Sequence, residues 1–163
     1  MREIEFRGKD IGTGKWVFGD LHTLCDKPHI HTDKSNFPYA GKRSFVIPET
    51  IGQFTGLLDK NGKKIFEGDI LRVLEYENLL MNEFSDDAGR FDMFTLEEIR
   101  GKLKVEYVSP VVFLDGGFQI STRDNYFNMF LACLFGDMKR SSPSFEFEVI
   151  GNIHDTPELL ENK

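Results

Sequence analysis

The densest group of side chains able to do chemistry lies in the first quarter of the chain. Three of the four histidines and one of the two cysteines fall within ten residues, as His22, Cys25, His29 and His31. Imidazole and thiolate are zinc ligands, and two histidines at i and i+2 of a strand share a face. The spacing fits no established zinc pattern, however, and Pro28 should interrupt any regular element that aims all four inward. We therefore expect no metal here, with a structural zinc site as the alternative.

Carboxylates form the second group. Eight acids and a single base, Arg90, lie between Glu75 and Glu98, so this segment carries the whole formal net charge of −7. A metal-dependent hydrolase could use carboxylates, but acids concentrated in one segment are typical of a solvated loop. We expect residues 78–101 to be an acidic excursion from the fold. A binding surface that attracts a partner or mimics nucleic acid is one alternative. A contribution to the core is another, because the segment contains the large apolar residues Leu79, Leu80, Met81, Phe84, Phe91, Met93 and Phe94.

The strongest local signal for structure is the stretch Gln53–Leu71, QFTGLLDKNGKKIFEGDIL. Asn-Gly is a strong hairpin signal, because glycine adopts positive φ without a Cβ clash. We expect Gly62 to have positive φ in a turn that joins strands 53–58 and 63–66. Asp59 is expected to accept a hydrogen bond from the backbone of this turn.

Alternating apolar and polar residues, separated by turn residues, predict the other strands. In Glu3–Gly8 we expect Ile4 and Phe6 to be buried and Arg7 to face solvent. Asn125–Phe135 is apolar on nearly all sides, which we interpret as a helix covered by the core, or otherwise by a partner. Trp16 is expected to pack rather than to stack on a ligand. The remaining predicted strands are 16–20, 43–47, 70–76, 102–108, 111–114, 118–121 and 145–150.

Four segments resemble one known family. Gln53–Leu71 is similar to the signature of the YopX family, whose small proteins occur mostly in phages and prophages. Arg2–Leu21 resembles the N-terminus of the family, Val46–Gly52 the lead-in to the signature, and Glu148–Leu160 the C-terminal tail. The resemblance implies a fold and a phage context, but no assigned biochemical activity.

Together these patterns predict a mainly β protein with minor helices. We expect an N-terminal β subdomain over residues 1–65, which includes the start of the signature hairpin. It would pack on a C-terminal SH3-like barrel over residues 66–163, which carries the acidic excursion and a C-terminal tail. The length of 163 residues and the 40% hydrophobic content suit a folded core.

The sequence also indicates the cellular location of the protein. No apolar run approaches the ~20 residues of a membrane span, and the charged N-terminus lacks the apolar segment of a signal peptide. We therefore expect a cytoplasmic protein without a membrane partner. Cys25 and Cys133 are the only cysteines and lie far apart in sequence, which argues against a disulfide framework.

No catalytic constellation is recognisable, so we expect a non-enzymatic phage or prophage accessory protein without a cofactor. It would act by binding an unknown host or phage protein, and a homo-oligomer is possible. The alternatives are a metal-dependent hydrolase and a nucleic-acid module of SH3-like type. The acidic charge balance disfavours nucleic acid, unless four basic residues share one face: Lys42, Arg43, Lys139 and Arg140.

Overall fold

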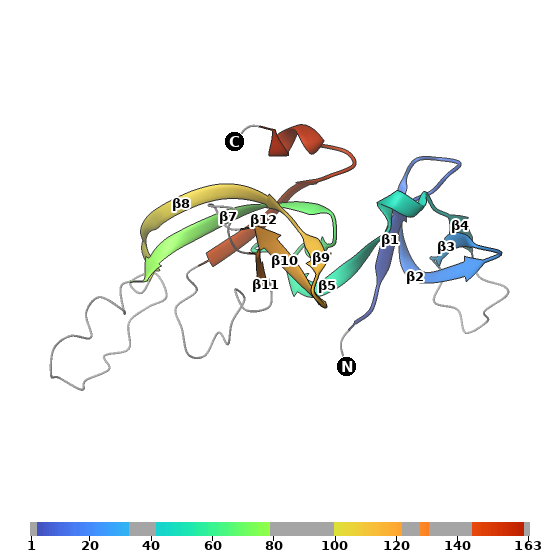
Figure 1. Cartoon of the computed structure of the whole chain (residues 1–163), viewed down its shortest axis with the longest axis horizontal. Helices are drawn as coiled ribbons and strands as arrows, with labels where there is room; N and C mark the ends of the chain where they lie inside the picture. Colours follow the sequence, from blue (N-terminus) through green and yellow to red (C-terminus); the bar gives the residue numbers. More distant parts are fainter. Residues whose placement is uncertain (1–2, 33–41, 79–99, 122–127, 131–144, 162–163) are drawn as a thin grey trace, which may run out of the picture.

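The computed structural model describes residues 3–32, 42–78, 100–121, 128–130 and 145–161, and most of the residues in these ranges lie in antiparallel strands (Figure 1). The prediction of a mainly β protein is confirmed. Regular helix in these ranges is limited to two short 3-10 turns, η1 (Pro48–Thr50) and η2 (Pro157–Leu160). Within the same ranges, no helix has the length and apolar character needed to span a membrane. Most of the acidic excursion lies outside the described residues, and only its two ends are described. Cys133, Lys139 and Arg140 also lie outside the described residues.

The first 66 residues contribute all strands of a six-stranded sheet. In spatial order these are β4 (Arg43–Phe45), β3 (Lys27–His31), β2 (Trp16–Leu24), β1 (Phe6–Lys9), β5 (Gly52–Leu58) and β6 (Lys64–Phe66). β5 and β6 pair antiparallel, and Gly62 in their turn has a φ of +79°. Both predictions about this hairpin are therefore confirmed.

Two three-stranded sheets complete the described structure. One has the order β12 (Phe145–Asn152), β7 (Asp69–Asn78) and β8 (Arg100–Pro110). The other has the order β11 (Asn128–Phe130), β10 (Gly117–Ser121) and β9 (Val112–Leu114). Its antiparallel β9–β10 pair corresponds to the predicted strands 111–114 and 118–121.

The helix predicted over Asn125–Phe135 is wrong at its centre. Asn128–Phe130 forms β11 and pairs antiparallel with β10. Periodicity cannot separate a short buried strand from a buried helix, and a Phe-rich segment also suits a strand. The rest of this segment, 125–127 and 131–135, lies outside the described residues.

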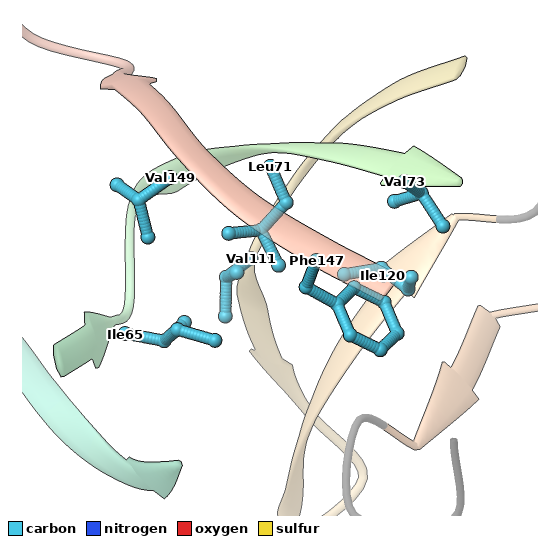
Figure 2. Close-up of a cluster of buried hydrophobic side chains, with 7 residues drawn as sticks. All are labelled: Ile65, Leu71, Val73, Val111, Ile120, Phe147 and Val149. Atoms are coloured by element: carbon cyan, nitrogen blue, oxygen red, sulfur yellow. The ribbon is translucent and has the colours of Figure 1, made fainter. Parts of the chain in front are cut away.

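The main apolar core draws on several sheets. Figure 2 shows its side chains pointing toward one another from β6, β7, β10, β12 and the link between β8 and β9. Burying a side chain of this size contributes about 1.5–3 kcal/mol. The members are Ile65, Leu71, Val73, Val111, Ile120, Phe147 and Val149.

The strands described form open sheets, and no closed barrel is found among them, so the SH3-like barrel is not confirmed. Ile65 ends the predicted N-terminal subdomain, yet its side chain belongs to a core made mostly by later residues. The division at residues 65 and 66 stays a prediction.

Candidate functional site

Charged residues from distant segments of the chain meet beside β1, an inner strand of the first sheet. Arg7 lies on β1, Asp69 begins β7, and both are buried. The Arg7 Nη1 lies 2.5 Å from Asp69 Oδ1, and Arg7 Nη2 donates to the Glu67 carbonyl oxygen at 2.9 Å. The other Asp69 oxygen accepts from the Phe66 backbone N–H at 2.8 Å. This pair joins β1, near the start of the chain, to the turn between β6 and β7.

Aromatic rings enclose the buried guanidinium. The Arg7 Cζ lies 4.8 Å from the centroid of the Trp16 ring and 5.1 Å from that of Phe66. Ring faces attract a cation at such distances, and more strongly where water is excluded. Burial raises the pKa of Asp69, while the Arg7 guanidinium and the Phe66 N–H act in the opposite direction. The site is therefore a desolvated ion pair held by packing on both sides.

A second carboxylate, Asp155, follows β12 and extends this network. Its Oδ2 accepts from Trp16 Nε1 at 2.6 Å and from Asn152 Nδ2 at 2.8 Å, and its Oδ1 lies 2.5 Å from Lys9 Nζ. Asn152, Lys9 and Trp16 together hold the pKa of Asp155 well below its usual range. The Trp16 ring also lies 6.0 Å from that of His154. Trp16 therefore has a packing role, as expected.

We name Arg7, Lys9, Trp16, Asp69 and Asp155 the junction cluster. Each of its two carboxylates is held by a cation and by N–H donors, so neither is free to act as a general base. Its contacts connect the N-terminal, signature and C-terminal segments, which lie far apart in the sequence. The arrangement fits a structural tie better than a catalytic centre.

Sequence reasoning placed Arg7 on the wrong face of its strand. Arg7 is 7% exposed, whereas Ile4, the expected core residue, is 63% exposed. Alternation alone assigns a charged residue to solvent, and the partner that compensates the burial of Arg7 is 62 positions away. The one available signal was Asp69, an acid at the entrance of an apolar strand.

The structure brings together three of the four residues considered as candidate metal ligands. The ring centroids of His22, His29 and His31 are 4.6–5.8 Å apart, and His29 Nε2 lies 3.2 Å from His31 Nε2. Cys25 instead occupies the exposed turn between β2 and β3, with a φ of +48°. Pro28 lies inside β3 and pairs with Thr23, so it interrupts nothing.

One of the two reasons for expecting no metal, an interruption by Pro28, is therefore wrong. The expectation itself stays a prediction. Across the described ranges, no three or more His, Cys, Asp or Glu side chains already have the geometry of a metal site. Arg43, one of the four basic residues considered for nucleic acid, lies beside this group and pairs with His31. Whether Lys139 and Arg140 share its face is outside the described residues.

A surface feature that sequence reasoning missed lies on β9. Val112, Phe113 and Leu114 are 38%, 51% and 45% exposed, so both faces of this strand present apolar side chains. In the described structure, β9 pairs with β10 alone and forms the edge of its sheet. An uninterrupted apolar run cannot show which residues a strand leaves exposed, so the sequence held no signal for this surface.

The fold thus defines an all-β protein whose N-terminal, signature and C-terminal segments are tied together by the junction cluster. The family model of the YopX protein matches residues 5–161, and the chain belongs to the YopX family. Among solved structures, the chain is similar to the crystal structure of protein EF1440 from Enterococcus faecalis. The identity is 23%, the match covers 98% of this chain and 99% of that one, and the TM-score is 0.49. No curated protein matches the chain.

Proposed function

We propose that this YopX-family chain is a phage or prophage accessory protein that acts by binding another protein. Membership of the family supports the phage context. The observation that carries the binding role is β9, an edge strand whose three side chains are all apolar and all exposed. Exposed apolar patches commonly mark interaction sites.

The edge of β9 offers a defined mode of binding. Edge strands are usually protected by charged residues, proline, bulges or a covering segment. Val112–Leu114 contains neither a charge nor a proline, and its described pairing is on one side only. An extended apolar segment of a partner protein can add to such an edge through backbone hydrogen bonds while its side chains contact those of β9. We therefore assign a protein segment in extended conformation as the partner.

The competing functions have weaker support. A hydrolase needs a carboxylate that is free to bind metal or accept a proton, and both carboxylates of the junction cluster are engaged with cations. A nucleic-acid module needs a basic surface to neutralise phosphates, whereas the chain carries a net charge of −7. A non-enzymatic protein-binding role requires neither feature.

A pull-down with a matched pair of variants tests this function. Leu114 and Leu24 are both 45% exposed and both lie on strands, but only Leu114 is on β9. Leu114→Glu should abolish retention of the partner from extracts of host cells that carry the phage or prophage, and Leu24→Glu should retain it. Equal retention by the wild type and both variants would contradict the role of β9. If the wild type sediments as a dimer and Leu114→Glu as a monomer, the partner is a second copy of this chain.

A further inference from the structure

We propose that His22, His29 and His31 bind one divalent transition-metal ion of the zinc class. The site lies on one face of β2 and β3, in the part of the first sheet that also contains β4 (Figure 1). This assignment replaces the expectation of no metal. It is independent of the proposed function, because β9 belongs to a different sheet.

The strand register places the three imidazoles on the same face. His22 on β2 lies directly opposite His29 on β3, and His31 follows His29 by two positions. Cross-strand partners and residues at i and i+2 share a face of a sheet. The ring contacts agree, with centroid separations of 4.6 Å for His22–His31, 5.1 Å for His29–His31 and 5.8 Å for His22–His29.

Two of the ligand atoms already have the separation that a metal requires. His29 Nε2 and His31 Nε2 are 3.2 Å apart. Two nitrogens bound to one tetrahedral zinc ion, each at about 2.0–2.1 Å, are about 3.3–3.4 Å apart. In the metal-free arrangement, one proton between these two nitrogens can satisfy both. Metal binding at both Nε2 atoms moves this proton to Nδ1 of the ring that carries it, which frees both Nε2 lone pairs for the ion.

The third ligand needs only a side-chain rotation. His22 is exposed and makes ring contacts with both other histidines, so it can turn toward the ion without displacing core residues. In the metal-free arrangement of the described residues, the three side chains do not have the geometry of a complete site. Water, or the Asp20 carboxylate directly opposite His31, can provide the fourth ligand.

Burial and nearby charges both affect cation binding by the three histidines. His29 is 4% exposed, and its Nδ1 is buried without a partner. Neutral imidazole is the form that binds metal. The positive charge of Arg43 opposes an incoming cation, and the negative charge of Asp20 compensates it.

Titration of the metal-free, untagged full chain with Zn²⁺ tests the site, with Co²⁺ as a spectroscopic probe. We expect one ion per chain, a rise in melting temperature, and the intense visible absorption of tetrahedral Co²⁺. His22→Ala and His31→Ala should each weaken binding by at least about tenfold. Both residues are more exposed than His29, so these variants avoid a cavity in the core, and circular dichroism checks their fold.

Two control variants separate this site from other zinc ligands. His154→Ala removes the one histidine outside the group, and Cys25→Ser removes the exposed thiol at the turn between β2 and β3. Both should bind Zn²⁺ like the wild type. The proposal is overturned if the wild type takes up no stoichiometric ion, or if His22→Ala and His31→Ala bind as tightly as the wild type. It is also overturned if either control loses binding.

Discussion

The backbone N–H of Val149 donates to Asp59 Oδ2 at 3.0 Å, across 90 positions of sequence. The other oxygen of the same buried carboxylate accepts from the backbone N–H groups of Asn61 and Lys63 at 2.8 and 2.9 Å. Burial opposes the ionisation of Asp59, but these three N–H donors outweigh it and lower its pKa. One side chain therefore shapes the signature turn and attaches that turn to β12.

Replacing Asp59 should destabilise the protein strongly. Asp59→Ala removes the acceptor of three N–H groups, of which that of Val149 is buried, and should lower the free energy of unfolding by about 2–4 kcal/mol. Asp59→Asn keeps one carbonyl oxygen and should cost less. Urea denaturation of both variants measures the difference. Equal stability of Asp59→Ala and the wild type would show that this carboxylate does not hold β12.

The buried ion pair of the junction cluster should show strong coupling. Asp69→Ala leaves the Arg7 guanidinium buried without its carboxylate and should cost about 3–5 kcal/mol. The double variant Arg7→Met, Asp69→Ala also removes the unpaired guanidinium charge and should be more stable than Asp69→Ala alone. A double-mutant cycle by chemical denaturation measures this coupling. Additive effects of the two substitutions would contradict it.

Gly62 provides a test of pure backbone strain. Its φ is +79°, and a Cβ atom built there would have no heavy atom within 4 Å beyond those of Gly62 and its two chain neighbours. The cost of a substitution is therefore conformational and not steric crowding by neighbours. Gly62→Val should lower stability by about 1–3 kcal/mol, whereas Gly62→Asn should cost less because asparagine tolerates positive φ. Thermal melts of the two variants compare them directly, and equal melting temperatures would argue against strain at this turn.

His154 should make stability fall in mild acid. Burial, with Arg7 and Lys9, lowers its pKa below the ordinary value of about 6.5. Below that pH the unfolded chain binds more protons than the folded one, so the contribution of His154 is present above about pH 6.5 and is lost as the pH falls through its folded pKa. His154→Gln should therefore flatten the pH dependence of unfolding between about pH 7 and 5. The same slope in variant and wild type would exclude a contribution from His154.

The acidic excursion should be removable. Asn78 at the end of β7 pairs with Arg100 at the start of β8, so the two ends of residues 79–99 are already neighbours in the sheet. A short Gly/Ser linker can therefore replace this segment, because each doubling of loop length changes the closure entropy by only about 0.6 kcal/mol.

The shortened chain should remain folded, as measured by circular dichroism and a cooperative melt. It loses six acids and Arg90, which moves the net charge from −7 to −2. An electrostatic partner should then bind more weakly and with less salt dependence. An insoluble product, or a melt without cooperativity, would show that the apolar side chains of this segment belong to the core.

Local chemistry made the signature hairpin predictable. Asn61-Gly62 specifies a turn within a few residues, and Asp59 was expected to accept a backbone hydrogen bond from that turn, as it does. Its bond to Val149 could not be predicted, because nothing in the sequence of the turn indicates which distant strand will lie beside it.

Long-range pairing also explains why some predictions from the sequence were wrong. Arg7 looked like a solvent-facing residue because its carboxylate partner lies on another sheet. Pro28 looked like an interruption, but β3 accommodates it opposite Thr23. The histidine group was recognised from its spacing, yet only the register of β2 with β3 shows that His22, His29 and His31 share one face.

The order β12-β7-β8 has a consequence for synthesis on the ribosome. All strands of the six-stranded sheet are available once residue 66 has emerged, so this sheet can begin to pair early. β7 emerges next, but one of its two neighbours, β12, is not made until residues 145–152. Unpaired strand edges invite association with other chains. The nascent protein is therefore most exposed to aggregation during translation of the interval between β7 and β12, and slower elongation there would prolong that exposure.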